Sequence, residues 1–527
     1  RNNKMNSKRA WVHLIDIEKP GIQNNTADVQ RLEKSLKQSI QNMLGKGQTP
    51  IKVRIPFHLI KHLPGFLRTW DFRAKAVLFR KNQDWLLLYL LPPESEKAIL
   101  GAALDIGTTR MEIALIDLQT GLEIANTGFD NPQVAIGPDI LTRIHYSAQP
   151  GGLEQLSRLL TEALNQSLDH LCRSHGYKKE DIYIVSGAGN TAMTHLFAGI
   201  ETFDLIKEPY IPCTNIPDTI LAREIRLDIN ENGLVYLFPN IGSYFGGDLI
   251  AGIIYSNLDQ KQAPCLMVDV GTNAEIVVGC KDFLIACAGA AGPALEGGVS
   301  KIGMTAGPGV IDRVWLEPDT REIGFHTIED KAPVGICGSG MIDLAAALFL
   351  SGRMDIRGKL LEAGCRDRLI QKDGINAFVL ADEQHSGTGE SIVLSQIDLN
   401  SLTSSKAAMY TILEVIVKNT AGLEFHNLEK FLVAGTFGSF INPVSAISIG
   451  MLPDIPTSLF EVMGNSSLGG CKELLLNPEA YDRILNIRNS ITYIELNVNQ
   501  EFMNLFSGAK FYPHTDASRF PTIRVQT

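Results

Sequence analysis

The stretch that decides the fold is Leu104-Asp-Ile-Gly-Thr-Thr109, and residues 268–273 repeat its pattern as Val-Asp-Val-Gly-Thr-Asn. Asp105 and Asp269 lie 164 residues apart. In each copy an apolar run ends in Asp, and a glycine turn with hydroxyl or amide side chains follows. A repeat at domain-sized spacing points to gene duplication. The pair therefore predicts two β-hairpins that face one nucleotide, whereas a single copy would be read as an ordinary hairpin.

The residue types of these hairpins suit a metal-bound triphosphate. Glycine at a hairpin tip lets backbone N–H groups approach phosphate oxygens, and such amide concavities favour anions. Mg²⁺ is usually held by one or two carboxylates plus substrate phosphates, so Asp105 and Asp269 are predicted as metal ligands and catalytic residues. The predicted phosphate contacts are Gly107, Thr108, Thr109, Gly271, Thr272 and Asn273.

A third apolar strand, Phe431 to Val433, also runs into a glycine turn, which contains Gly435, Thr436 and Gly438. Two phosphate hairpins followed by such a turn resemble the nucleotide-binding pattern of the superfamily of actin, sugar kinases and heat-shock chaperones. In that superfamily the third turn holds adenosine. The resemblance implies an α/β fold with a duplicated actin-like (ribonuclease H-like) ATPase core of two lobes. Alternation of strand and helix patterns with short glycine turns favours α/β layering as well.

Two segments of small residues, 186–192 and 465–470, lie where the superfamily places its hinge elements. Small side chains there would let two helices cross closely. The alternative for each segment is a helix N-cap.

Composition limits the class of protein. With 45% hydrophobic and 20% charged residues the chain is typical of a globular protein of several domains. Its net charge of −10 argues against nucleic acid as the principal partner. The apolar run Trp85–Leu91 falls far short of the ~20 residues of a membrane helix, and Arg1–Arg9 lack the apolar core of a secretion signal. We therefore expect a cytoplasmic protein without a membrane partner.

The eight cysteines include no Cys-x-x-Cys pair. This spacing fits neither a disulfide scaffold nor a zinc or iron–sulfur site. Buried free thiols are the favoured interpretation.

The chain is expected to divide into several parts. Helical spacing of Val29, Leu32, Leu36 and Ile40 predicts a helix over 28–43. The predicted strands of the N-terminal part are 10–17, 51–55, 76–80 and 85–91; farther on, helices over 153–172 and 406–420 precede strands 182–185 and 431–433. The predicted parts are a small N-terminal α/β domain (1–92), a linker (93–99), a first ATPase lobe (100–265), a second ATPase lobe (266–515) and a C-terminal tail (516–527).

Two further stretches of the sequence are rich in glycine. Residues 286–298, with Glu296 as their one charge, predict a loop that approaches a ligand. Residues 336–343, with Gly338 and Ser339, predict a turn that feeds a helix N-terminus, which could bind an anion. A structural role is an equal alternative for both stretches.

Several motifs together make the resemblance more specific. They are Asn131-Pro-Gln133, Gly137-x-Asp139-Ile-Leu-Thr-Arg143, Gly189-Asn-Thr-Ala-Met-Thr-His195, Ala291-Gly-Pro-Ala-Leu-Glu296, Gly335-Ile-Cys-Gly-Ser-Gly340 and Gly464-Asn-Ser-Ser-Leu-Gly-Gly470. This combination resembles the reductive activators of corrinoid proteins over about residues 100–515, and the N-terminal part is similar to that family's middle domain. The resemblance implies an ATP hydrolase that uses ATP and Mg²⁺ to drive reduction of a corrinoid methyl carrier from Co(II) to Co(I).

In that family the electron usually passes through a 2Fe-2S domain, but the first 99 residues here contain no cysteine. Either a cluster domain lies upstream of Arg1, or Met5 is the true start and a separate protein supplies the electron. The resemblance implies a corrinoid protein as partner and an electron donor such as ferredoxin, and it leaves a homodimer open.

Two rival functions share the same cleft. A small-molecule kinase would need a carboxylate base, for which Asp248 and Glu296 are candidates; the alternative for Asp248 is a helix N-cap before Leu249. The second rival is a chaperone-like module in which ATP gates protein binding.

Overall fold

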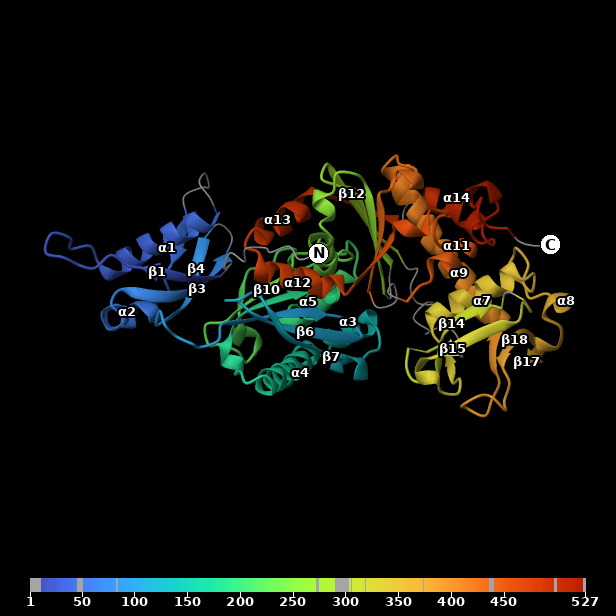
Figure 1. The fold of residues 1–527 in the computed structure, drawn as a ribbon, viewed down its shortest axis with the longest axis horizontal. Coiled ribbons are helices and arrows are strands. Elements are labelled where there is room, and N and C mark those ends of the chain that lie inside the picture. Colours follow the sequence, from blue (N-terminus) through green and yellow to red (C-terminus); the bar gives the residue numbers. More distant parts are fainter. Residues whose placement is uncertain are drawn as a thin grey trace. The chain divides into compact units, whose positions relative to one another are not determined.

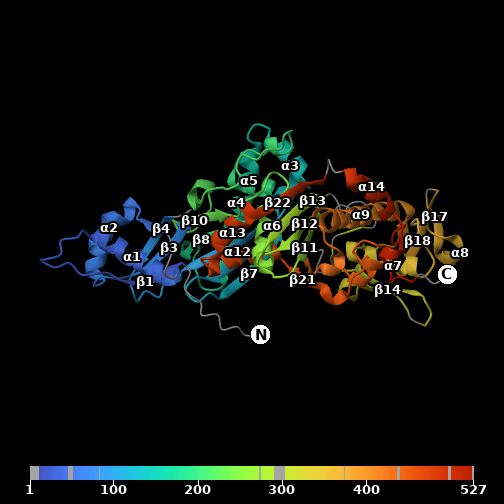
Figure 2. The same ribbon diagram turned by 90° about the horizontal axis from the view of Figure 1, so that it is seen from above.

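The computed structural model describes residues 11–44, 51–81, 84–271, 274–289, 303–304, 306–317, 319–372, 374–435, 440–496 and 500–524. The chain divides into two compact units. The first unit contains residues 1–255 and 467–489, and the second contains 256–466 and 490–527. Each is described by itself (Figures 1 and 2).

The first unit begins with a small α/β domain, as the sequence predicts. Its elements are β1 (Val12–Asp16), α1 (Asp28–Leu44), β2 (Lys52–Arg54), α2 (Phe57–Thr69), β3 (Arg73–Lys81) and β4 (Asp84–Leu91). The strands form one sheet in the order β1-β3-β4-β2. The predicted stripe of α1 is buried at Leu32, Leu36 and Ile40. Helix α2 was not predicted, because Pro64 and Gly65 inside it are helix-breaking signals; its buried Leu59, Leu63 and Leu67 hold it in place.

Aromatic side chains attach this domain to the rest of the first unit. The ring of Phe79 lies 4.7 Å from that of Trp11 and 6.1 Å from that of Tyr236. The indole N–H of Trp11 donates to the carbonyl oxygen of Leu474 at 3.1 Å. All of these rings are buried, so the attachment is a hydrophobic core rather than a surface contact.

The main sheet of the first unit has the order β7-β6-β5-β8-β10-β9. Its strands are β5 (Leu100–Ile106), β6 (Arg110–Asp117), β7 (Glu123–Asp130), β8 (Ile182–Ala188), β9 (Ile220–Leu221) and β10 (Leu234–Leu237). The accompanying helices are α3 (Ile140–Ser147), α4 (Gly152–Ser174), α5 (Thr191–Ala198), α6 (Gly247–Ser256), α12 (Ser466–Leu476) and α13 (Ala480–Ser490). Strands β7, β6 and β5 form an antiparallel meander, and β8 and β10 continue it in parallel.

The main sheet of the second unit repeats five strands of this arrangement, in the order β21-β20-β11-β12-β13-β22, but its sixth strand, β22, pairs with the meander at the edge opposite to that of β9. Its strands are β11 (Cys265–Val270), β12 (Ala274–Cys280), β13 (Phe283–Gly289), β20 (Lys430–Ala434), β21 (Phe460–Gly464) and β22 (Ile491–Glu495). Here β13, β12 and β11 form the antiparallel meander, and β20 and β21 continue it in parallel. The predicted duplicated α/β core is confirmed, with β5 and β11 as equivalent strands. Residues 286–289, expected in a loop, instead belong to β13.

The second unit contains further helices and strands outside this sheet. They are β14 (Val310–Leu316), β15 (Ile323–Thr327), β16 (Gly335–Ile336), α7 (Gly338–Leu350), α8 (Glu362–Cys365), β17 (Leu369–Lys372), β18 (Ile375–Ala381), β19 (Ile392–Ser395), α9 (Gln396–Glu414), α11 (Pro443–Ser448) and α14 (Gln500–Ala509). Helix α9 begins ten residues before the predicted Lys406, because Ser395 and Asp398 form a capping box at its start. A π-helical turn, Val415–Thr420, continues it.

Two expectations from composition can be compared with these elements. All eight cysteines are free, and seven are buried as expected, whereas Cys213 is exposed. Within the described ranges no helix combines the length and apolar character needed to cross a membrane.

The helices α6 and α12 of the first unit cross closely at glycine. A β-carbon on Gly470 would overlap the carbonyl oxygen of Ala251, and one on Gly469 would lie 2.5 Å from the ring of Tyr255. The segment 465–470 therefore supports the close crossing that its small residues predict.

We expect Gly470→Ala to lower the melting temperature of the protein, since overpacking a tight contact costs about 1–3 kcal/mol. Thermal unfolding followed by circular dichroism measures the shift. The control is Gly65→Ala in α2, where a β-carbon would meet nothing within 4 Å. Alanine is the better helix former by about 1 kcal/mol, so the control should unfold no earlier than the wild type. An unchanged melting temperature for Gly470→Ala would contradict the close crossing.

Candidate nucleotide site

The first hairpin joins β5 to β6 and carries Asp105 near the end of β5. Leu104 and Ile106 on either side are fully buried in the core of the first unit, whereas Asp105 is partly exposed. Because side chains alternate along a strand, the carboxylate lies on the opposite face of the sheet from these two residues. The apolar neighbours thus fix where the carboxylate points.

The tip of this hairpin is held by backbone and amide contacts. A β-carbon on Gly107 would overlap the carbonyl oxygen of Arg110, so the turn requires glycine. The side-chain N–H of Asn131 donates to the carbonyl oxygen of Gly107 at 2.8 Å, and its backbone N–H donates to Thr109 O at 2.8 Å. Asn131 therefore fixes both ends of the predicted phosphate turn.

Asn190 supports the same turn from the end of β8. Its side-chain oxygen accepts from Met193 N at 2.9 Å and caps α5, which confirms the N-cap alternative for this segment. Its amide N–H donates to Thr108 Oγ1 at 3.0 Å. A β-carbon on the preceding Gly189 would lie 2.6 Å from Ile106 O, so β8 and β5 approach closely here. One asparagine thus connects a helix start to the hairpin tip.

A buried guanidinium lies behind Asn131. Arg143 is fully buried and donates through Nε to Gly137 O at 2.8 Å and through Nη1 to Gln133 Oε1 at 3.3 Å. Burial lowers the pKa of Arg143 to about 10, against the opposing effect of Asp139. These contacts give the motif of Gly137, Asp139 and Arg143 a structural role, since Arg143 holds the segment that follows Asn131.

Asp105 and Asp248 both lie close enough to the Cys471 thiol of the first unit to act on it electrostatically. Gly247 N donates to Gly189 O at 3.0 Å, which brings the start of α6 to the end of β8. The Cys471 thiol donates to Leu104 O at 3.3 Å. Burial raises the pKa of this thiol, and the charges of Asp105 and Asp248 raise it further. Asp248 is inside α6 rather than before it, so the N-cap expectation was wrong; its Oδ1 accepts from the adjacent Leu249 N at 2.9 Å.

The second unit brings together Asp269 and Gly435. Strands β11 and β20 run in parallel with Asp269 opposite Ala434. Gly435 has φ +83°, and a β-carbon on it would lie 2.6 Å from Asp269 Oδ1, so glycine is required beside this carboxylate. Gly271, by contrast, faces open space in which a β-carbon would meet nothing within 4 Å. The open space at Gly271 and the glycine beside the carboxylate fit a phosphate-bound metal.

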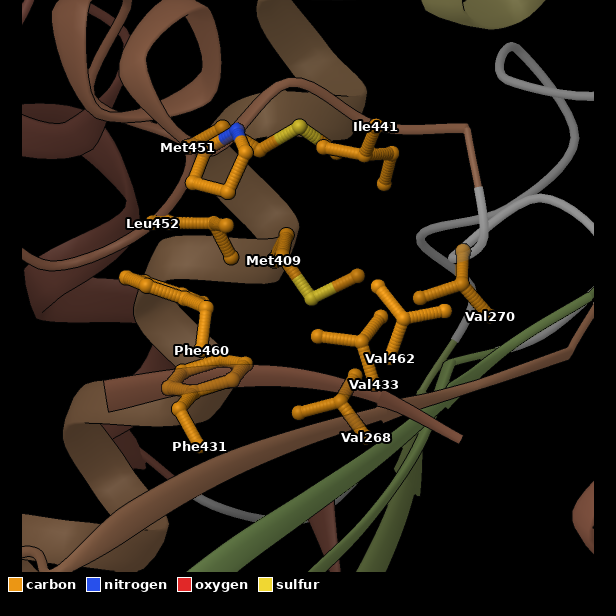
Figure 3. A pocket seen from close by; sticks show the side chains of 11 residues that line it. Val268, Val270, Met409, Phe431, Val433, Ile441, Met451, Leu452, Phe460 and Val462 are labelled. Carbon is orange, nitrogen blue, oxygen red and sulfur yellow. The ribbon is translucent and has the colours of Figure 1, made fainter. Parts of the chain in front are cut away.

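An apolar cavity lies on the other face of the same sheet (Figure 3). The strand residues that line it are Val268 and Val270 of β11, Phe431 and Val433 of β20, and Phe460 and Val462 of β21. Since every lining residue is apolar, this cavity cannot bind a triphosphate. By the alternation of β11 it places the carboxylate of Asp269 on the opposite face.

The glycine-rich segment at Gly338 and Ser339 has a structural role. Gly338 and Ser339 begin α7 and are buried; the Ser339 hydroxyl donates to Asp312 O at 3.0 Å. A β-carbon on Gly340 would lie 2.6 Å from Ile311 O. Close packing of α7 on β14 thus accounts for the small residues, and anion binding there stays a prediction. Thr272, Asn273, Glu296, Thr436 and Gly438 lie outside the described residues.

The sequence motifs included Asn131 and Asn190 but did not predict their contacts to the first hairpin, and Cys471 was expected only to be a buried free thiol. An asparagine between a strand and a helix start is a recognisable capping signal. The second contact of Asn190, to Thr108 of the hairpin, joins residues far apart in the sequence, so no neighbouring residue predicts it.

Comparison with known proteins covers most of the chain. Residues 7–97 match the model of the RACo linker region, residues 100–261 that of the RACo middle region, and residues 263–524 that of the C-terminal domain of RACo, the ASKHA domain. The corrinoid activation enzyme RamQ of Eubacterium limosum is 31% identical over 458 residues, which are 85% of this chain and 76% of the relative. A [Co(II) methylated amine-specific corrinoid protein] reductase of Methanosarcina barkeri is 24% identical over 446 residues, which are 77% of this chain and 76% of the relative.

A solved structure agrees with the sequence comparisons. The reductive activator for corrinoid, iron-sulfur protein superimposes with a TM-score of 0.82 at 34% identity, covering 97% of this chain and 80% of that one. The three matched regions follow one another in the same chain, and the actin-like fold is shared. The expected likeness of the N-terminal part to the family's middle domain was wrong, because that part matches the linker region and the middle region is residues 100–261. The chain therefore belongs to the RACo family.

Proposed function

We propose that this protein is an ATP-dependent reductive activator of a corrinoid methyl-carrier protein, which it returns from Co(II) to Co(I). The family and the names of two relatives and one solved structure support this function. The ATP dependence of the proposed function rests on the duplicated hairpin. An aspartate lies near the end of β5 and of β11, and a glycine turn follows each strand.

In this proposal each unit contributes one carboxylate to the same nucleotide. Asp105 and Asp269 hold Mg²⁺, and the turns after them supply N–H and hydroxyl donors to the phosphates. Bound ATP and Mg²⁺ supply a phosphoryl group that can be transferred to water. The protein's part is positioning and charge stabilisation, as is usual for phosphoryl transfer. Asp105 or Asp269 would also orient the attacking water.

A nucleotide bound by both units would favour the arrangement of the units in which both carboxylates reach it. It shifts the conformational equilibrium by its differential affinity for that arrangement, and hydrolysis removes the bias. A corrinoid protein that binds one arrangement of the units more tightly than the other is therefore affected by ATP binding and hydrolysis. ATP hydrolysis can in this way drive a reduction that is unfavourable by itself.

The direct test mixes the chain, a Co(II) corrinoid protein and a chemical reductant, with and without ATP, and follows the cobalt absorbance. We expect conversion to the Co(I) spectrum only with ATP, together with ATPase stimulation by the corrinoid protein. ATP consumption in equal amounts with a small metabolite, indifferent to corrinoid protein, would instead identify a kinase. ATP-gated binding of proteins without any cobalt reduction would identify a chaperone-like module.

The two carboxylates should be individually essential. We expect Asp105→Ala and Asp269→Ala each to lower ATP turnover more than about a hundredfold, since the developing phosphate charge loses its metal. Asp282→Ala is the matched control, because Asp282 is an exposed aspartate between β12 and β13. Steady-state phosphate release measures the rates. Wild-type turnover in either variant would refute the assignment.

Asn190 offers a finer test of hairpin positioning. Serine caps a helix about as well as asparagine but is too short to reach Thr108, so Asn190→Ser should keep the start of α5 and lose only the hydrogen bond to the hairpin. We expect the KM for ATP to rise about two- to tenfold, which corresponds to the loss of one hydrogen bond. Thr108→Val removes the same bond from the other side, and the double variant should be no worse than the more impaired single variant. Fully additive effects would show that the two side chains act independently.

A further inference from the structure

The charge of this protein is strongly divided along the chain. Residues 1–99 contain 18 Lys and Arg and eight Asp and Glu, whereas residues 100–527 contain 30 and 50. Within residues 51–81 there are eight basic residues and a single acidic one, Asp71. A small basic domain is thus joined to a strongly acidic remainder.

Many of the basic side chains in this domain have internal partners. Arg80 pairs with Asp482 at 2.5 Å, the Lys75 ammonium donates to Ser95 O at 2.7 Å, and Arg31 donates to backbone carbonyls. These contacts serve the fold. These contacts do not explain the basic residues on the exposed side of α2.

Helix α2 contains no acidic residue. Its Leu59, Leu63 and Leu67 are buried, and on the opposite side His58, Lys61, His62 and Arg68 are exposed. We call these four residues, together with Phe57, the α2 face. Arg68 pairs with Asp28 at 2.7 Å and remains half exposed. The helix has 13 residues and is therefore ~20 Å long.

Aromatic side chains accompany the charges. Phe57 is 69% exposed at the start of α2, with the Lys61 ammonium 5.3 Å from its ring centroid. Phe66 and Trp70, which are partly buried, stack at 4.7 Å with an interplanar angle of 7°. Exposed aromatic side chains such as Phe57 are typical of protein interfaces, where they supply buried contact area.

We propose that the α2 face docks the acidic surface of a small electron-carrier protein. This inference rests on the proposed function, in which the reduced carrier loses the one electron that Co(II) gains on becoming Co(I). Complementary charge increases the rate of such an encounter, and electron-transfer complexes are among the smallest protein interfaces. One helix face provides a patch of that kind.

A polyanion is a poorer fit to this surface. Nucleic acid or an anionic lipid surface extends well beyond one helix, and binding strengthens with the number of basic side chains that it meets. The remainder of the chain carries a net charge of −20 from its 30 basic and 50 acidic residues. A compact acidic protein can use the α2 face without meeting that charge over a large area.

The test compares two reductants in the ATP-dependent cobalt assay: a reduced acidic 2Fe-2S ferredoxin and titanium(III) citrate. The variant is His58→Glu/Lys61→Glu; glutamate at position 58, in the first turn of α2, is favourable for the helix, and position 61 is exposed. The control is His170→Glu/Lys178→Glu, which makes the same change of charge at two exposed positions of the acidic part. Both proteins are compared with the wild type at low and high salt.

We expect the ferredoxin-driven rate of the variant to fall about tenfold at low salt, with the titanium-driven rate within about twofold of the wild type. The control should keep both rates, and added salt should weaken ferredoxin binding to the wild type. Equal ferredoxin-driven rates in variant and wild type would overturn the proposal. So would loss of both rates, because the α2 face would then serve the corrinoid protein, and so would preferential binding of anionic vesicles or DNA.

Failure of the proposed function gives a different result. If wild-type protein reduces no cobalt with either reductant, titration of fluorescently labelled ferredoxin still measures docking. Weaker binding to the variant than to the control would support the α2 face independently of the reaction. Equal binding to both would refute it.

Discussion

The close approach of backbone segments at glycine is the constraint on which the first half of the site depends. At the end of the sheet β5 meets its own hairpin, β8 and the start of α6, and α12 crosses α6. Gly107, Gly189 and Gly470 occupy positions where a β-carbon would meet a carbonyl oxygen. These contacts fix the position of the Asp105 carboxylate relative to Asn131 and Asn190, which hold the turn. The hydrogen bonds of Asn131 and Asn190 are therefore a consequence of the glycine contacts.

The duplication preserved topology more strictly than local detail. Strands β5 and β11 carry equivalent aspartates in sheets that share five strands in the same order, whereas the sixth strand, β9 or β22, lies at the opposite edge. Gly107 is packed against its own hairpin, whereas Gly271 faces open space. The glycine after the neighbouring parallel strand is required in both halves: a β-carbon on Gly189 would approach Ile106 O, and one on Gly435 would approach Asp269 Oδ1. The two halves thus share a glycine next to the strand that carries the aspartate, although its contacts differ.

The duplicated core could be predicted from sequence because its signal is local, since each aspartate and glycine turn lies next to its own strand. Helix α2 could not, because burial of three leucines overrides the breaking effect of Pro64 and Gly65, and burial depends on the whole domain. The start of α9 was missed although Ser395 and Asp398 form a local signal. Asn190 has a cap that sequence can suggest and a contact to Thr108, 82 residues away, that it cannot. The exposure of Cys213 likewise depends on tertiary structure.

The attachment of the N-terminal domain connects the two proposals. Trp11 and Phe79 are buried against Tyr236 and the backbone at Leu474, so the domain belongs to the same compact unit as Asp105. A carrier docked on α2 would then be held by the unit that also holds the first phosphate turn. Asp269 belongs to the other unit. If ATP couples the units as proposed, the change that it drives need not disturb the electron supply, because the proposed docking surface on α2 and the first hairpin belong to one compact unit.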